Sequence, residues 1–213
     1  MFKRRDPITI FDIGACEGED SIRYARLFPK ASIFAFEPMP VNIDRMRPLL
    51  RKYRVDGQVR PFNVALSDSS GVSQFHPSFG HPEGIEETPD WDYGNKSGSL
   101  LAPGSVTEHH PWLKFGDAID VETVRLDAFC KTNGVLAIDF VHIDVQGAEL
   151  AVLRGAGAML AKIRAIWMEV EAVPLYKGQP LAGEVEAFML GNGFTKYRDD
   201  LAGISGDQLY VRQ

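Results

Sequence analysis

The chain has 213 residues, of which 45% are hydrophobic and 24% charged, and its net charge at pH 7 is −6. This length predicts a single domain, residues 1–213, with enough apolar residues for a full core. The acidic balance argues against general nucleic-acid binding, which needs a basic face, although a local RNA contact stays open.

Cysteine usage and hydropathy indicate the compartment. Cys16 and Cys130 have neither disulfide nor zinc spacing. No apolar run is long enough to span a membrane, and the basic segment Met1–Pro7 is too short for a signal peptide. We therefore expect a cytoplasmic protein with neither a membrane nor a nucleic-acid partner.

Strands and helices alternate along the chain. The expected strands are Ile8–Ile13, Ala31–Phe36, Val59–Leu66, Val121–Leu126, Asp139–Asp144, Ala165–Glu171, Phe194–Tyr197 and Gln208–Arg212. The expected helices are Asp20–Phe28, Val41–Tyr53, a short one through Cys130, one through Leu153, and Leu181–Leu190. This alternation predicts an α/β fold with a mostly parallel sheet and helices on both faces. Ligands of such sheets bind beyond the carboxyl ends of the strands.

The turn after the first strand has the pattern D-x-G-x-x-x-G, formed by Asp12, Gly14 and Gly18, with Ala15 inside it. Its glycines let backbone approach a ligand. Glu37, followed by Pro38, ends the second strand, where an acid can bind both hydroxyls of a ribose.

The same turn indicates which nucleotide is bound. A third glycine under a pyrophosphate is missing, and Cys16 and Glu17 stand where a diphosphate would come close. A carboxylate at Glu17 would repel phosphate but tolerate a cation. The pattern therefore favours a ligand with ribose and adenine but no phosphate, such as S-adenosylmethionine, over a dinucleotide.

Leu66, Ser67 and Asp68 follow the third strand. Asp68 could accept a hydrogen bond from an adenine amino group while a backbone N–H of Leu66 or Ser67 contacts the ring edge. A simple Asx-type turn is the better explanation of Asp68 taken alone.

Residues 75–120 interrupt the alternation and are rich in proline, glycine and aromatic residues. A long irregular segment inside a compact domain is often a functional lid. We expect a lid-like insertion in which Trp91, Tyr93 and Trp112 stack on an acceptor.

Acidic residues gather at the ends of two later strands. Asp144 ends an apolar strand, so it must be paired, coordinated or exposed to a polar cleft, and His142 shares its face. Glu169 and Glu171 share one face of the next apolar strand. As general base we consider Asp144 first, then Glu169 and His142. The spacing fits no standard metal site, so we expect no metal.

Several motifs resemble the FkbM family of S-adenosylmethionine-dependent methyltransferases. The resemblance rests on Phe11–Ala15 with Gly18, Phe36–Pro38, Asn63–Asp68 with Gly71, Ser97–Leu100, Val124–Asp127, and above all Ile143–Leu150 running into Val152–Ala156. It covers roughly Ile8 to Phe194. It differs from the family pattern at His142, where a lysine is frequent, and at Gln146, where glutamate is frequent.

The resemblance implies a class I methyltransferase fold: a Rossmann-like, seven-stranded sheet whose last strand is antiparallel. It also implies S-adenosylmethionine as cofactor, and methylation of a hydroxyl on a sugar or natural-product small molecule. Two alternatives are a non-catalytic interaction module on the same fold and an NAD-dependent oxidoreductase. The oligomeric state stays open.

Overall fold

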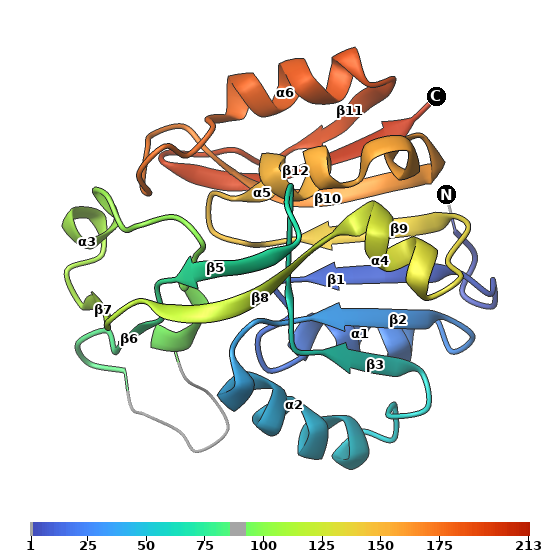
Figure 1. Cartoon of the computed structure of the whole chain (residues 1–213), viewed down its shortest axis with the longest axis horizontal. Helices are drawn as coiled ribbons and strands as arrows, with labels where there is room; N and C mark the ends of the chain where they lie inside the picture. Colours follow the sequence, from blue (N-terminus) through green and yellow to red (C-terminus); the bar gives the residue numbers. More distant parts are fainter. Residues whose placement is uncertain (1, 86–92) are drawn as a thin grey trace.

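The computed structural model describes residues 2–85 and 93–213, and its centre is a seven-stranded sheet (Figure 1). The strand order is β11-β12-β10-β9-β1-β2-β3. The five strands from β10 to β3 are parallel, and β12 is antiparallel to both β10 and β11. The strands are β1 (Thr9–Ile13), β2 (Ser32–Phe36), β3 (Val59–Phe62), β9 (Ile138–Ile143), β10 (Ile163–Glu171), β11 (Phe194–Asp199) and β12 (Ser205–Arg212). The expected fold class is confirmed, including the antiparallel last strand.

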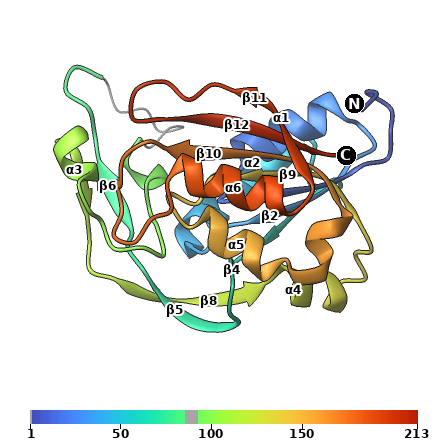
Figure 2. The same cartoon turned by 90° about the horizontal axis from the view of Figure 1, so that it is seen from above.

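Helices cover both faces of the sheet (Figure 2). The α1 and α2 helices pack on one face around Ile10 and Ile33, and α4, α5 and α6 pack on the other around Phe11 and Phe34. Neighbouring residues of a strand point to opposite faces of the sheet, so the apolar residues of β1 and β2 contribute to a hydrophobic core on each face. The helices are α1 (Glu19–Leu27), α2 (Pro40–Lys52), α3 (Val106–His109), α4 (Leu126–Thr132), α5 (Glu149–Gly155) and α6 (Ala182–Gly191), with 3₁₀ turns η1 (Gly94–Lys96) and η2 (Gly157–Lys162).

The expected single strand Val59–Leu66 is wrong, because the chain leaves the main sheet after Phe62. The Asn63 side chain donates to the backbone carbonyl oxygens of Glu37 (3.0 Å) and Pro38 (2.8 Å), which ends the pairing of β3 with β2. The next segment, β4 (Ala65–Ser67), pairs with a different strand in a second sheet.

That second sheet lies at the two ends of the insertion. Its order is β4-β8-β5, and a separate antiparallel pair within the insertion joins β6 to β7. The strands are β5 (Gly71–Phe75), β6 (Ser78–Gly80), β7 (Leu113–Phe115) and β8 (Ile119–Arg125). The insertion therefore begins and ends on a sheet that stands next to the carboxyl ends of β1 and β9 (Figure 1).

Phe129 of α4 lies at the centre of an aromatic cluster. Its ring centroid is 4.7 Å from that of Phe36, 4.8 Å from Phe62, 5.9 Å from Phe11 and 6.0 Å from Phe34. The cluster fixes α4 against three neighbouring strands.

Replacing Phe129 by alanine should lower the free energy of unfolding by ~3–5 kcal/mol, because it removes a buried ring and leaves a cavity. Urea denaturation measures the change. Leu136→Ala is the control, since Leu136 is 78% exposed and its loss should cost less than ~0.5 kcal/mol. Equal losses in both variants would contradict this account of the core.

Candidate active site

The turn after β1 brings three strand ends together. Gly14 has φ +87°, and a Cβ there would lie 1.8 Å from the carbonyl oxygen of Asp144. The backbone N–H groups of Gly14 and Ala15 both donate to the carbonyl oxygen of Phe36. Gly18, with φ +87°, begins α1 where a Cβ would meet Met46. Both glycines are therefore required by close packing as well as by backbone conformation.

Glu37 is buried at the end of β2 with its carboxylate facing this turn. It accepts hydrogen bonds from the backbone N–H of Cys16 (3.0 Å) and of Met39 (2.8 Å), and from the Asn42 side chain (3.3 Å). Burial raises the pKa of Glu37 to about 7, although these donors act in the opposite direction. The arrangement fixes the carboxylate and leaves acceptor capacity for a ligand hydroxyl.

A hollow begins at Glu37. Its walls are mainly apolar, and among the expected cofactor residues Gly14, Glu37, Pro38, Leu66 and Asp144 line it. The other lining residues are Ile13, Cys16, Phe36, Val64, Ala65, Phe75, Asn95, Lys96, Gly98, Leu100 and Val145. An apolar lining with a few polar groups is typical of a small-molecule site.

The other five expected cofactor residues, Asp12, Ala15, Gly18, Ser67 and Asp68, do not line this hollow. Ser67 is buried, and its carbonyl oxygen packs against Gly155. The Asp68 side chain is exposed, and its carbonyl oxygen accepts a hydrogen bond from Arg125 (2.8 Å). These positions favour a structural turn for Asp68.

A second hollow adjoins the first, and Gly14, Cys16, Lys96 and Asp144 line both. Its other lining residues are Asp12, Ala15, Glu19, Asp20, Arg23 and His142. Of the expected turn residues that the first hollow lacks, Asp12 and Ala15 line this second hollow and Gly18 does not.

The sequence argument from Glu17 is wrong. Its carboxylate is buried and lines neither hollow, and it accepts hydrogen bonds from Arg45 and Asn95, both at 2.9 Å. It therefore faces a guanidinium instead of a ligand.

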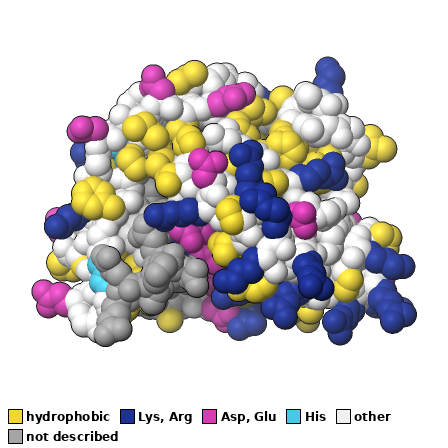
Figure 3. All heavy atoms as spheres, turned by 90° about the horizontal axis from the view of Figure 1, so that it is seen from below, with side chains coloured by type: hydrophobic (Ala, Val, Ile, Leu, Met, Phe, Trp, Pro, Cys, Tyr) yellow, Lys and Arg dark blue, Asp and Glu magenta, His cyan; other side chains and the backbone are white. Residues whose placement is uncertain are grey.

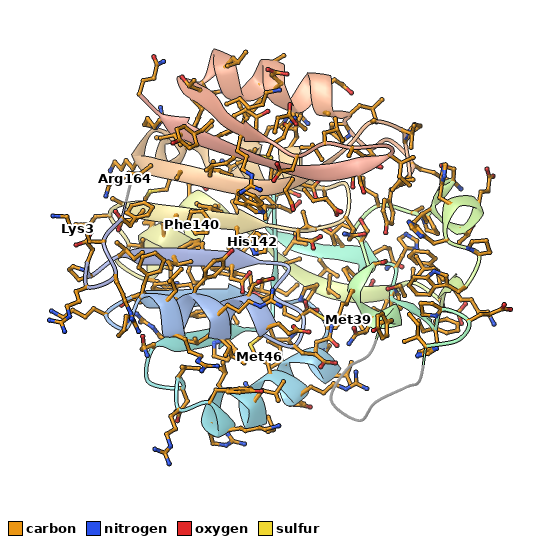
Figure 4. The ribbon with its side chains drawn as sticks, turned by 180° about the vertical axis from the view of Figure 1, so that it is seen from behind. Lys3, Met39, Met46, Phe140, His142 and Arg164 are labelled. Atoms are coloured by element: carbon orange, nitrogen blue, oxygen red, sulfur yellow. The ribbon has the colours of Figure 1, made fainter. Side chains whose placement is uncertain are left out.

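His142 of β9 lies beside the second hollow (Figure 4). Its Nδ1 is 3.3 Å from Asp12 Oδ1, and Asp12 Oδ2 accepts a hydrogen bond from the Ser21 hydroxyl. Burial lowers the pKa of His142, but Asp12 and the charges of Asp144 and Asp20 outweigh it and raise the pKa to about 9. His142 is thus an imidazolium at neutral pH, paired with Asp12.

Asp144 and Glu169 are bridged by one amide. Gln146 Nε2 donates to Asp144 Oδ1 and to Glu169 Oε2, both at 2.7 Å. Gln146 has φ +55°, and its Oε1 lies 3.0 Å from the Tyr176 hydroxyl. The expected pair of acids is therefore brought together, by a residue that the sequence reasoning did not use.

Burial raises the pKa values of all four acids in this region. The pKa of Glu169 rises to about 10, with the Asp144 charge adding to the effect, and that of Glu171 rises to about 7. The pKa of Asp144 is raised too, although Gln146 and His142 act against burial. Glu149 has a pKa of about 8, and it accepts the backbone N–H groups of Val145 and Gly147. Glu149 therefore shapes the turn instead of facing a ligand.

The insertion contributes Asn95, Lys96 and Gly98 to the site, which sequence reasoning missed. Lys96 Nζ is 2.5 Å from Glu19 Oε1 and 3.7 Å from Cys16 Sγ. Ser99 donates from its hydroxyl to the carbonyl oxygen of Gln146 (2.8 Å), which attaches the insertion to the end of β9.

The expected aromatic platform is not assembled by the described residues. Tyr93 packs edge-on against His81, and Trp112 packs in a small cluster beside Tyr176. Neither lines either hollow. Trp91 lies outside the described residues.

The residues present fit an adenosine ligand that carries a positive charge. A buried carboxylate, Glu37, stands at one end of an apolar hollow, and Asp144 stands where the two hollows meet. This fold and site define a class I S-adenosylmethionine-dependent methyltransferase.

The family comparison gives a more specific assignment. Residues 12–196 match the methyltransferase FkbM domain. The chain belongs to this family, and S-adenosylmethionine is its cofactor. The match favours a methyltransferase over an NAD-dependent oxidoreductase.

Two characterised relatives are similar along most of their length. The chain is 38% identical to the 2-O-methyltransferase NoeI of Sinorhizobium fredii over 179 residues, covering 84% of this chain and 69% of that protein. It is 28% identical to the 31-O-demethyl-FK506 methyltransferase FkbM of Streptomyces tacrolimicus, covering 94% and 78%.

Solved structures share the fold at low sequence identity. An O-methyltransferase family protein from Burkholderia thailandensis superposes with a TM-score of 0.52 at 10% identity, covering 96% of this chain and 51% of that one. TrmK of M. capricolum, in complex with S-adenosylhomocysteine, superposes with a TM-score of 0.50 at 12% identity, covering 98% and 63%.

The buried acids make the stability of the ligand-free protein depend on pH. The folded-state pKa values of Glu37 and Glu171, about 7, and Glu149, about 8, lie above the ordinary value of 4.5. Their contribution is fully present below pH 4.5 and is lost as the pH rises through the folded-state values. We expect the urea midpoint to fall between about pH 5.5 and about pH 8.5.

Glu149→Gln tests the cause, because an amide does not titrate. This variant should show a smaller fall in midpoint over the same range. A midpoint that stays constant or rises with pH in the wild-type protein would contradict the assignment of raised pKa values.

Proposed function

We propose that this enzyme transfers a methyl group from S-adenosylmethionine to a hydroxyl oxygen of a sugar or natural-product small molecule. The observation that carries the proposal is the position of Asp144, at the junction of the two hollows and 2.7 Å from the amide that also holds Glu169. The relatives NoeI and FkbM, whose names describe O-methyltransferases, support oxygen as the acceptor atom.

The first hollow would hold the adenosine part of the cofactor. Glu37 would accept hydrogen bonds from the ribose hydroxyls, and the apolar walls formed by Phe36, Leu66 and Leu100 would contact the adenine. Asp12 and Asp144 of the second hollow would balance the positive charge of the methionine part.

The bound cofactor supplies a methyl group on a sulfonium, which needs an aligned nucleophile and little further activation. The protein therefore has to orient the acceptor, exclude water and remove the hydroxyl proton. Asp144 is the base in this proposal. Glu169, with a pKa of about 10, and His142, with a pKa of about 9, both hold protons at neutral pH.

Glu169 and His142 would then be positioning residues. The imidazolium of His142 lowers the pKa of Asp144, and Glu169 shares the Gln146 amide with it. His142 and Gln146 therefore oppose the rise that burial causes in the pKa of Asp144, and the Gln146 amide fixes the position of its carboxyl group.

The same proposal includes a cytoplasmic setting, residues 75–120 as a lid, and no nucleic-acid partner. Both cysteines are free thiols, which suits a reducing compartment. Within the described residues, no helix is long and apolar enough to cross a membrane. The acidic groups around the second hollow would repel a phosphate backbone.

Calorimetric titration with S-adenosylhomocysteine tests the cofactor site. Glu37→Ala should weaken binding at least tenfold, ~1.4 kcal/mol, because the ribose loses its buried partner. Asp68→Asn is the matched control, since its side chain is exposed outside both hollows. Unaltered affinity in Glu37→Ala would show that Glu37 does not bind the cofactor. Weaker binding in Asp68→Asn would support the hydrogen bond from Asp68 to the adenine that the sequence suggested.

Asp144→Asn tests the base. Turnover, followed as formation of S-adenosylhomocysteine against a panel of sugars and hydroxylated small molecules, should fall by ~10²–10⁴-fold, with little change in cofactor affinity. Glu169→Gln should retain most of the activity, because an amide replaces a group that is already uncharged. A larger loss in Glu169→Gln than in Asp144→Asn would reverse the roles. If the wild type binds cofactor but methylates nothing in the panel, the non-catalytic alternative gains support.

A further inference from the structure

Charge is distributed very unevenly along this chain. Residues 1–60 contain 12 of the 23 Lys and Arg but eight of the 29 Asp and Glu, a net charge of +4. Residues 61–213 contain the other 11 basic and 21 acidic residues, a net charge of −10. The overall charge of −6 is therefore the sum of a basic N-terminal part, residues 1–60, and an acidic remainder.

Eleven of these 12 basic residues form one face of the molecule. All 12 are exposed, and the 11 lie on the N-terminal segment, on α1 and α2, and on the adjoining turns, whereas Arg60 of β3 lies over the Phe34 ring on the other face of the sheet. Figure 3 shows Lys and Arg side chains gathered on this side. The 11 residues are Lys3, Arg4, Arg5, Arg23, Arg26, Lys30, Arg45, Arg47, Arg51, Lys52 and Arg54, and we call this surface the basic face.

Few carboxylates neutralise the basic face. Of the eight acids in residues 1–60, only Asp44 and Asp56 are classed as exposed, whereas Asp12, Glu17 and Glu37 are buried. Within the described part of the chain, seven side chains of the basic face have no ion pair. They are Lys3, Arg4, Arg5, Arg26, Lys30, Arg51 and Arg54.

Part of the basic face is concave. A hollow near the amino ends of the strands is lined by Lys3, Arg4, Arg5, Pro29 and Lys30, with no acid among them. Figure 4 shows Lys3 at this end, close to Arg164 of β10, while His142 and Met39 lie nearer the other end. The hollow is thus separate from the candidate active site.

Large apolar side chains project from the same helices. Leu27 at the end of α1 is 53% exposed, Val41 at the start of α2 is 48% exposed, and Tyr53 just after α2 is 43% exposed. Arg26 precedes Leu27, and Lys52 and Arg54 flank Tyr53. Basic groups interleaved with apolar ones are the pattern of surfaces that lie on anionic lipid headgroups.

We propose that the basic face binds the phosphate headgroups of an anionic membrane surface. The Lys and Arg side chains contact the phosphates, and Leu27 and Tyr53 enter the boundary between headgroups and acyl chains. A nucleic acid also presents phosphates, but its phosphate backbone has no apolar layer that the exposed Leu27 side chain could enter. Binding at a membrane surface needs no spanning helix, so this proposal replaces the sequence-based expectation of no membrane partner.

The experiment is sedimentation of the full chain with vesicles. One set contains phosphatidylcholine alone, and the other contains equal parts of phosphatidylcholine and phosphatidylglycerol. We expect binding to the anionic vesicles only, weakening as salt is added. The double variant Lys30→Gln/Arg51→Gln should bind about 25-fold more weakly, at about fivefold for each charge removed.

The control variant is Lys131→Gln/Arg154→Gln. It changes the net charge equally, at exposed residues of α4 and α5 on the opposite face of the sheet. It should bind anionic vesicles like the wild type, and both variants should keep their affinity for S-adenosylhomocysteine, which shows that they are folded. Leu27→Ser should weaken vesicle binding without changing its dependence on salt.

Three results would overturn the proposal. The first is absence of binding to anionic vesicles, or equal binding to neutral ones. The second is an equal loss in the control variant, which would indicate an effect of net charge alone. The third is binding of polyuridylate RNA, sensitive to Lys30→Gln/Arg51→Gln, without binding to vesicles, which would assign the face to nucleic acid. All three are independent of the methyl-transfer proposal.

Discussion

The close contact between the turn after β1 and the end of β9 determines the geometry of the whole site. A Cβ on Gly14 would overlap the Asp144 carbonyl oxygen, and the Asp144 N–H donates to the Ile13 carbonyl oxygen at 2.9 Å. Any side chain at position 14 would push the two strand ends apart. The two hollows share Gly14 and Asp144 as lining residues, so their connection depends on this contact.

A second level of organisation places four acids around that junction, of which Glu149 and Glu171 are buried and Asp144 and Glu169 are half-buried. The energetic cost of burying them is reduced by protonation and by donors that belong to the local turns. Gln146 is central, because one NH₂ group serves two carboxyl groups and its own backbone accepts the Ser99 hydroxyl. The acids, the turn and the insertion are thus linked through a single residue.

Most of the main sheet could be predicted, because apolar runs of strand length alternate with helices whose apolar residues recur at helical spacing. The division of Val59–Leu66 could not be predicted. It depends on the Asn63 amide reaching two carbonyl oxygens 25 and 26 residues away. Local propensity contains no information on such a contact.

The same distinction applies to the site. Glu37 and Asp144 could be predicted from the sequence because they end apolar strands. An acid at such a position must be paired or must face a polar cleft. Glu17 was misjudged because its partners, Arg45 and Asn95, come from α2 and from the insertion. Lys96 was missed because an irregular segment gives no periodicity from which to infer its direction.

The acidic lining of the second hollow has a consequence for exchange of the cofactor. Methyl transfer converts a sulfonium into a neutral thioether, so the ligand leaves with one positive charge fewer than it brought. In this hollow Asp12 and Asp20 are paired with His142 and Arg23, and Glu19 is paired with Lys96. Asp144 is held instead by the Gln146 amide. Negative charge at Asp144 attracts the charged donor more strongly than the neutral product, so electrostatics at this one position favour the exchange of product for donor.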